Sequence, residues 1–354
     1  MSKLADGKVT IGLDLGDRYS YLALVDGEGE ILEETRIRTK APPLRQWFGR
    51  VEEARVALEV GTHSPWVSRL LEELGHEVIV ANARKVRMIY GGDHKSDRLD
   101  AEALARLARL DPALLSGIDH RGEQAQQDLA VIRAREVLVR TRTRLINHFR
   151  GVVKSAGERV PRCSAASFHR KAAEAIPEGF DAALQPLLDQ IEQVSHQIRQ
   201  YDRRIEEMAT ERYPETSVLQ QVAGVGPITS LTYVLTLEDP DRFRKSRAVG
   251  AYLGLCPRTD QSGDRDPQCR ITKAGNGMLR RLLVQAAHYQ LGPFGPDNDL
   301  RRWGLARAER GGRIAKKKAV IAVARKLAVL LHHLWQTGEV YEPLHNNEPI
   351  EEAA

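Results

Sequence analysis

Four carboxylates in the first hundred residues have types and positions suited to binding a divalent metal. Asp14 follows an apolar run in VTIGLDLGD, and Glu59 follows another in ARVALEV. Asp97 and Asp100 are three residues apart in KSDRLDAEALARL, so both lie on the same side of one helical turn. Carboxylate oxygens suit Mg²⁺ and Mn²⁺, and such metals promote attack on phosphodiesters. The quartet therefore predicts nuclease or strand-transfer chemistry.

Each carboxylate alone also has a plainer interpretation. Asp14 could simply form a turn, and Asp97 and Asp100 could stabilise the N-terminus of a helix by their negative charge. Glu59 is harder to explain, because a charged side chain is poorly placed in a central strand unless it faces a site at the sheet edge. The combination is more specific than any member.

A second group of candidate residues lies in LGLCPRTDQSGDRDPQCRITKAGNGMLRR, at 253–281. Ser262 is a candidate nucleophile in a loop, although a Ser-Gly pair is more often only a turn. No histidine stands near it in sequence, so a hydrolase triad is not indicated. The residues after it could hold a phosphate, namely Arg270, Lys273, Asn276 and Arg280.

Between 219 and 239 the chain reads LQQVAGVGPITSLTYVLTLED, the pattern of a helix-hairpin-helix. Gly224 and Gly226 would let backbone N–H groups meet a DNA phosphate at a helix N-terminus. A glycine-rich turn between two packed helices is also ordinary architecture.

Positive charge is concentrated in two segments. Residues 121–171 hold twelve Lys and Arg against four acidic residues, and residues 301–326 hold ten against Glu309 alone. Clustered cations repel one another unless phosphates or acidic groups neutralise them, so a polyanion partner is expected. The alternative is an ordinary solvated helix face. The residues we single out are Arg142, Arg144, Lys316, Lys317 and Lys318.

The elements that must position these residues follow from apolar periodicity. Three strands with a hairpin, then strand, helix, strand and helix up to residue 110, predict a ribonuclease-H-like α/β domain. A heptad over 184–208 has an apolar or aromatic residue at every seam position and predicts a coiled coil or long helical hairpin. We expect an α/β domain at 1–115, a basic helical linker and coiled coil at 116–212, a mainly α-helical domain at 213–336, and an acidic tail at 337–354.

Three scattered cysteines without CxxC spacing argue against a disulfide framework and a zinc site. No stretch approaches the roughly 20 apolar residues that a membrane span needs. We therefore expect a cytoplasmic or nucleoid-associated protein.

With these residues in place, the chain resembles the insertion-sequence transposases that have a RuvC-like N-terminal domain and a DEDD tetrad. The resemblance rests on Asp14, Glu59, Asp97 and Asp100, and on VAGVGPITS, AVGAYLGLCPR, QSGD and ITKAGNGMLRRLL in the second half. It implies Mg²⁺ or Mn²⁺ held by the tetrad, and Ser262 as a nucleophile joined covalently to DNA. It also implies excision and insertion of a mobile element, a guide (bridge) RNA, and dimers or tetramers to which the heptad is suited.

Three other readings stay open at this point. A RuvC-like junction nuclease would cut with metal-activated water alone. A sugar- or acetate-kinase-like ATPase shares the IGLDLG start but would need further glycine-rich nucleotide-binding segments, which we do not find. A DNA-binding protein without catalysis would not depend on Asp14.

Overall fold

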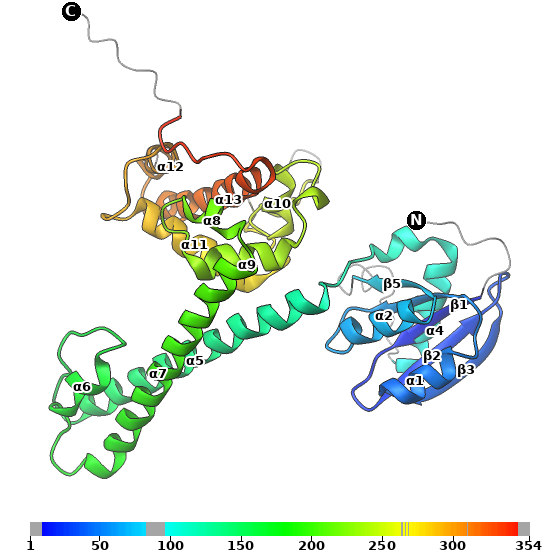
Figure 1. Cartoon of the computed structure of the whole chain (residues 1–354), viewed down its shortest axis with the longest axis horizontal. Helices are drawn as coiled ribbons and strands as arrows, with labels where there is room; N and C mark the ends of the chain where they lie inside the picture. The colour runs from blue at the N-terminus through cyan, green and yellow to red at the C-terminus, as the bar shows by residue number, and fades with distance from the viewer. Residues whose placement is uncertain are drawn as a thin grey trace, which may run out of the picture. The chain divides into compact units, whose positions relative to one another are not determined.

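The computed structural model describes residues 9–82, 96–262, 265, 267, 269–309 and 311–345. The chain divides into two compact units, Met1–Arg121 and Gly122–Ala354. Each unit has its own elements and its own cores, and each is described by itself below (Figure 1).

The first unit is built on a five-stranded mixed sheet with strand order β3-β2-β1-β4-β5. The strands β1 (Thr10–Asp14), β2 (Tyr19–Val25) and β3 (Ile31–Arg38) are antiparallel neighbours, as the predicted hairpin requires. The strands β4 (Arg55–Glu59) and β5 (Glu77–Ala81) continue the sheet in parallel with β1. The unit is thus an α/β domain with a mixed sheet, consistent with a ribonuclease-H-like start.

Helices cover both faces of this sheet. On one face, α1 (Ala41–Phe48) and α2 (Ser64–Glu73) pack onto alternate residues of the central strands, including Leu13 and Leu58. On the other face lies α4 (Asp97–Leu110), followed by the short 3-10 helix η1 (Pro112–Leu115). No helix was predicted at α1, between the third and fourth strands. Its two prolines are in the first turn, where a missing N–H costs nothing.

The contact between α4 and the sheet is unusually close at Gly12. A Cβ atom at this position of β1 would lie 1.9 Å from the carbonyl oxygen of Ala101 and 2.5 Å from the amide nitrogen of Ala105. Glycine is therefore required here by the approach of the helix backbone. The small residues Ala101 and Ala105 complete the fit by packing with Ala23 and Val25 of β2.

The second unit begins with a long antiparallel helical hairpin. The helix α5 (Glu123–Ser155) packs along α7 (Asp181–Glu211), and α6 (Phe168–Ala173) lies at the end of the hairpin away from the other helices (Figure 1). Seam residues of the predicted heptad, such as Leu184, Ile191 and Ile198, are buried in this hairpin. The seam therefore pairs within the chain, and a coiled coil between chains stays a prediction.

The rest of the second unit is a helical bundle. It consists of α8 (Thr216–Gln220), α9 (Pro227–Leu237), η2 (Pro240–Arg242), α10 (Arg247–Tyr252), α11 (Gly277–Leu291), α12 (Asp299–Glu309) and α13 (Arg313–Thr337). Tyr233 of α9 is fully buried in its core, and its hydroxyl donates to the carbonyl of Ala328 at 2.6 Å. Among the described residues, no helix is both long enough and apolar enough to cross a membrane.

Candidate functional site

The carboxylates Asp14 and Glu59 lie at the carboxyl ends of two adjacent central strands. β1 and β4 are paired in parallel up to Leu13 and Leu58, and each acid is the next residue along its strand. Side chains alternate between the faces of a sheet, and Gly12 and Ala57 face α4. Asp14 and Glu59 therefore face the α4 side as well, next to one another.

The two helical acids lie in the first turn of α4. Asp97 precedes Ala101 and Ala105 by whole turns on the row that packs over β1 and β2. Asp100 similarly precedes Leu104 on the row that packs over β4 and β5. The far end of α4 lies at the start of β4, where the Arg55 guanidinium donates to the carbonyl of Ala108 at 3.4 Å. The helix therefore runs antiparallel to β1 and β4, and its acidic first turn lies toward the strand ends that carry Asp14 and Glu59.

This arrangement brings four oxygen-donor groups to one edge of the sheet. Glu59, Asp14 and Asp100 are half-buried, and Asp97 is exposed. A set of carboxylates without sulfur or imidazole ligands suits a hard cation such as Mg²⁺ or Mn²⁺. Among the described residues, no three His, Cys, Asp or Glu side chains meet closely enough to form a complete metal site. The donor chemistry of these four groups fits a divalent cation.

A histidine and an aspartate that the sequence analysis did not single out flank the same edge. His63 follows Glu59 in the loop before α2, and its Nε2 lies 3.7 Å from Oδ1 of Asp17, which follows Asp14. Trp66 Nε1 donates to His63 Nδ1 at 3.1 Å, which leaves the neutral ring its proton on Nε2. Their position in the loops directly after two acid-bearing strands was the available signal.

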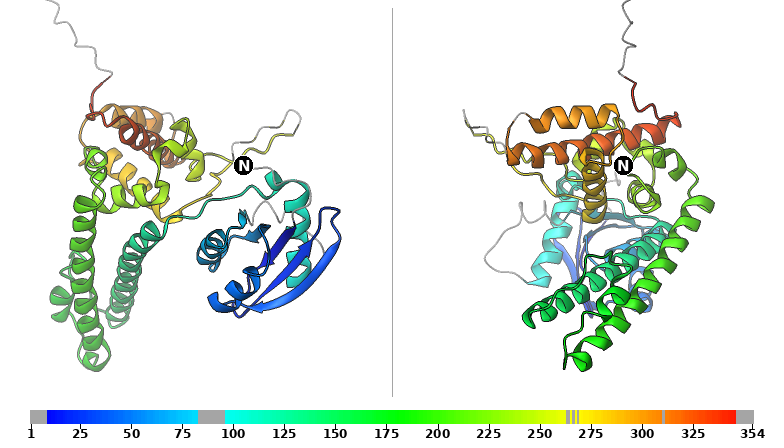
Figure 2. Two further views of the ribbon diagram at one scale, coloured as in Figure 1. Left: turned by 45° about the vertical axis from the view of Figure 1, so that its right-hand side comes forward. Right: turned by 90° about the vertical axis from the view of Figure 1, so that its left-hand side faces the viewer.

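An extended arm of the second unit projects from the helical bundle (Figure 2), and Ser262 belongs to it through its antiparallel bridge to Arg265. The arm is a narrow antiparallel pair: Arg258 N–H donates to the Arg270 carbonyl, and Thr272 N–H donates to that of Cys256. At its far end, Ser262 and Arg265 exchange two backbone hydrogen bonds of 3.1 and 3.0 Å. The serine is exposed there.

Two of the residues predicted to bind phosphate, Arg280 and Asn276, have structural roles at the base of the arm. Arg280 uses its Nη1 to donate to the carbonyls of Leu253 at 2.9 Å and Ala274 at 2.6 Å, so it ties the two strands of the arm together. Asn276 caps α11 by accepting from the amides of Met278 and Leu279. Arg270 and Lys273 are exposed and remain candidates for phosphate contact.

The glycine turn before α9 also has a packing role. Gly224 has a φ of +83°, and a Cβ there would lie 3.0 Å from the Tyr289 ring and 3.2 Å from the Ala286 carbonyl of α11. Gly226 precedes the first residue of α9 and has open space around it. The preceding α8 has only five residues, so a helix-hairpin-helix stays a prediction, with Gly226 as its open position.

The basic candidates differ in accessibility. Arg142 is half-buried between the hairpin helices, where its Nη1 donates to Ser195 Oγ at 3.3 Å. Burial and nearby Arg135 lower the pKa of Arg142. Its location favours a packing role over nucleic-acid contact. Arg144 is exposed on α5, and Lys316, Lys317 and Lys318 are exposed at the start of α13.

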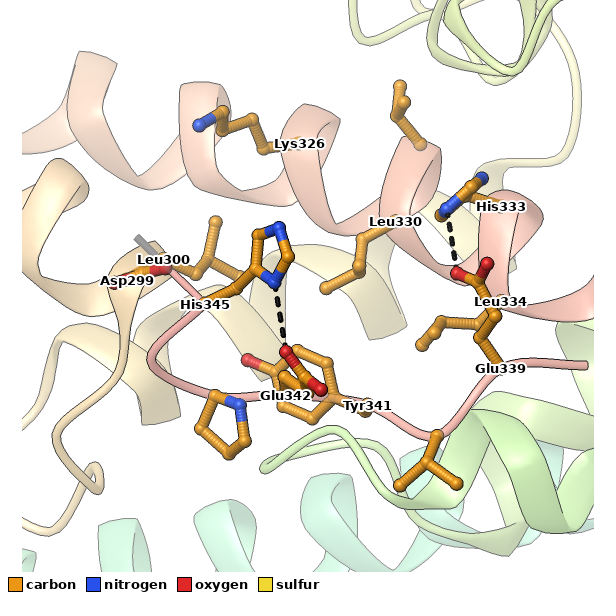
Figure 3. Close-up of a pocket in the computed structure, with 13 residues that line it drawn as sticks. Asp299, Leu300, Lys326, Leu330, His333, Leu334, Glu339, Tyr341, Glu342 and His345 are labelled. Atoms are coloured by element: carbon orange, nitrogen blue, oxygen red, sulfur yellow. Dashed lines mark hydrogen bonds and ion pairs between the residues drawn. The ribbon is translucent and has the colours of Figure 1, made fainter. Parts of the chain in front are cut away.

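A cavity of about 710 Å³ lies elsewhere in the second unit, between α13 and the chain that follows it (Figure 3). Tyr341 N–H donates to Gln221 Oε1, and Asp299 N–H donates to the Pro343 carbonyl, so the segment up to His345 is docked. No predicted site residue lines this cavity. It is therefore separate from the candidate chemistry.

Two family models match the chain over the regions that carry these residues. One, described as a transposase of the DEDD type, matches residues 11–157, and the other, the transposase IS116/IS110/IS902 family, matches residues 216–296. These matches cover the strands that carry Asp14 and Glu59 and the arm that carries Ser262. They define the class of protein as an enzyme that recombines DNA. The chain belongs to the DEDD-type insertion-sequence transposases.

Full-length relatives agree with this assignment. The chain is 28% identical to a probable family 20 transposase of Pseudomonas aeruginosa, over 94% of this chain and 98% of the relative. It is 26% identical to the transposase for insertion sequence element IS1111A of Coxiella burnetii, over 94% and 90%. It is 29% identical to the transposase for insertion sequence element IS1328 of Yersinia enterocolitica, over 78% and 82%. The kinase-like reading and the non-catalytic reading are thereby set aside.

Proposed function

We propose that this transposase cleaves and rejoins DNA at the ends of its element by using Asp14, Glu59, Asp97 and Asp100 as ligands of Mg²⁺ or Mn²⁺ and Ser262 as the nucleophile. The observation that carries the proposal is the common edge of the sheet, where Asp14 and Glu59 face the side on which α4 begins with two aspartates. Exposure of Ser262 near the end of the arm supports its assigned role.

In the proposed reaction, Ser262 Oγ attacks a DNA phosphorus. The Oγ–P bond forms while the bond from phosphorus to the leaving sugar oxygen breaks; the serine proton passes to a base, and the leaving oxygen takes up a proton. A bound divalent cation would polarise the phosphate and stabilise charge on the leaving oxygen. Attack by another DNA hydroxyl on the phosphoserine reverses these steps and restores Ser262. One phosphodiester is exchanged for another, so joining needs no nucleotide cofactor.

The test is incubation of the full chain and Mg²⁺ with nicked suicide DNA that spans the element end, followed by denaturing gels and peptide mapping. We expect a protein–DNA adduct on Ser262 that is absent in Ser262→Ala and in Asp97→Ala. Thr259→Val is the matched control, because it removes another exposed hydroxyl from the same arm. Free DNA ends without an adduct, unchanged in Ser262→Ala, would instead support a RuvC-like nuclease that uses activated water.

We further propose that a structured guide RNA from the element directs this reaction and that the protein acts as a dimer or tetramer. The family resemblance and the exposed lysines at the start of α13 support the RNA partner. The heptad of α7 is already buried against α5, so assembly would use other surfaces. RNA sequencing of the protein purified from cells carrying the element, with light scattering of the same sample, tests both points.

A further inference from the structure

An exposed stripe of α5 combines cationic and polar side chains with a glycine that the fold does not need. Arg144, Asn147, His148, Gly151 and Lys154 are all exposed. Their spacing follows the helical repeat, so they form one face, roughly 15 Å long at 1.5 Å per residue. The opposite face of α5 packs into the hairpin through Ile146, Phe149 and Val153.

Gly151 has no structural explanation within the second unit. It lies inside a 33-residue helix, and a Cβ atom at this position would meet nothing within 4 Å. A glycine inside a helix costs about 1 kcal/mol relative to alanine. By contrast, Gly12 and Gly224 in the same chain are explained by atoms at 1.9 and 3.0 Å. A glycine of this kind is useful where another molecule approaches the helix backbone closely.

Within the described part of the chain, the basic residues of α5 are ion-paired near the start of the helix and not near its end. Toward its start they are neutralised by acids, since Asp128 binds Arg212, Arg135 binds Asp202, and Glu136 accepts from Arg140 and Arg281. Toward its end, Arg144 and Lys154 form no ion pair with any described residue. The acidic residues of this end of the hairpin lie in the loop after α5, beyond α6 and on α7, at Glu158, Glu174, Glu178, Asp181, Asp189 and Glu192, and none of these described residues is ion-paired with Arg144 or Lys154. The stripe thus keeps its positive charge free.

We propose that this stripe, Arg144 to Lys154 of α5, docks against double-helical DNA, with Gly151 at the point of closest approach. A straight α-helix fits the major groove of B-form DNA, whereas the deep, narrow major groove of duplex RNA does not admit it. Arg144 and Lys154 would contact phosphates, and Asn147 and His148 can hydrogen-bond to phosphate or base edges. The inference rests on the chain being a DNA transposase and is independent of the proposed metal and serine chemistry.

The test measures equilibrium binding of the full chain to a labelled random-sequence DNA duplex without divalent metal, in parallel with the duplex RNA of the same sequence. Gly151→Ala should raise the thermal midpoint of the second unit and still weaken DNA binding several-fold. Arg144→Glu should weaken it about tenfold and reduce the slope of log K against log salt by about one. Arg203→Glu is the matched control, because it reverses an exposed charge on α7, the other helix of the hairpin.

Ser262→Ala separates this inference from the proposed function, since it should abolish the covalent adduct and leave duplex binding unchanged. The inference is overturned if Gly151→Ala binds DNA as tightly as the unmodified chain while Arg144→Glu matches Arg203→Glu. It is equally overturned if the Arg144 and Gly151 variants lose affinity for the RNA duplex and keep it for DNA. Folding is monitored by circular dichroism, and the stabilising direction of Gly151→Ala rules out a loss through unfolding.

Discussion

Arg280 and Lys273 lie close in sequence and carry the same charge, but their surroundings give them different roles. Arg280 donates to two backbone carbonyls at the base of the arm, whereas Lys273 is exposed with a left-handed φ of 55°. The same contrast separates half-buried Arg142 from exposed Arg144 on α5. Residue type alone could not separate a cation that binds the protein's own carbonyls from one that is free to meet a phosphate.

This contrast gives a prediction for the arm. Arg280→Ala should lower the yield of Ser262–DNA adduct at least tenfold with little change in DNA affinity, because the strands that present the serine lose their shared donor. Lys273→Ala should weaken DNA binding and leave the adduct yield at saturating DNA nearly unchanged. Adduct yields at saturating DNA and binding constants for the two variants check this; equal effects of both variants on both quantities would contradict it.

His76 gives the first unit a dependence on pH. Its Nδ1 accepts from the Ala54 amide at 3.3 Å, and its Nε2 donates to the Phe48 carbonyl at 3.3 Å, so the neutral ring is the one that fits. Burial lowers the pKa of His76 below its ordinary value of 6.5. The unfolded chain therefore binds the proton more readily than the folded chain, and stability falls as the pH drops below about 6.5.

We expect the thermal midpoint of the first unit to decrease from pH 7 to pH 5. Uptake of this one proton should lower the free energy of unfolding by at most about 1.4 kcal/mol per pH unit. His76→Gln should be less stable at pH 7 and show a shallower pH dependence. His148→Gln, on an exposed face of α5, should leave the dependence of the first unit unchanged. Identical slopes for His76→Gln and the unmodified chain would exclude His76 as the source.

Among the elements, the packing of α4 on β1 affects both the stability of the first unit and the position of the candidate metal ligands. The helix lies so close to Gly12 that a methyl group has no room, and the same helix begins with Asp97 and Asp100. Any displacement of α4 would therefore move half of the proposed metal ligands relative to the other half. The close packing of small residues here positions the carboxylates.

Gly12→Ala should accordingly destabilise the first unit by about 3 kcal/mol and reduce metal-dependent cleavage more strongly than DNA binding. Gly117→Ala is the matched control, because its Cβ would meet only the Ile79 side chain at an ordinary 3.6 Å. Denaturant unfolding and adduct formation at several Mg²⁺ concentrations measure the two effects. Normal cleavage by a folded Gly12→Ala protein would show that the position of α4 does not control the site.

At the scale of the whole molecule, the two units have separate hydrophobic cores. In the second unit, buried Asp128 of α5 accepts from Arg212 at 2.6 Å and from the Tyr213 hydroxyl at 2.7 Å. Burial and this carboxylate raise the pKa of Tyr213 to about 12. Asp128 thus fixes the start of α5 to the end of α7.

We therefore expect calorimetry to resolve two unfolding transitions that respond to different substitutions. Asp128→Ala should destabilise the second unit by about 3 kcal/mol, because it leaves Arg212 and Tyr213 without their acceptor, and should not shift the first. Gly12→Ala should do the reverse. Asp189→Ala, on an exposed part of α7, should change neither by more than about 0.5 kcal/mol. A single transition shifted equally by both variants would contradict the division.

The five strands, helix α4, the long helices of the hairpin and the family could be predicted from the sequence, because apolar periodicity and motif spacing are local properties of the chain. The sequence also placed the four carboxylates at element ends. The helix α1, which was not predicted, has two prolines after Ala41, and these are tolerated because they lie in its first turn.

Which residues contact one another became known from the three-dimensional fold. It put β4 beside β1, so that Asp14 and Glu59 became neighbours, and it assigned the α7 heptad to α5 of the same chain. It also turned Arg280 and Asn276 inward and left Gly151 facing open space. These outcomes depend on contacts between segments distant in sequence, for which local spacing carries no information.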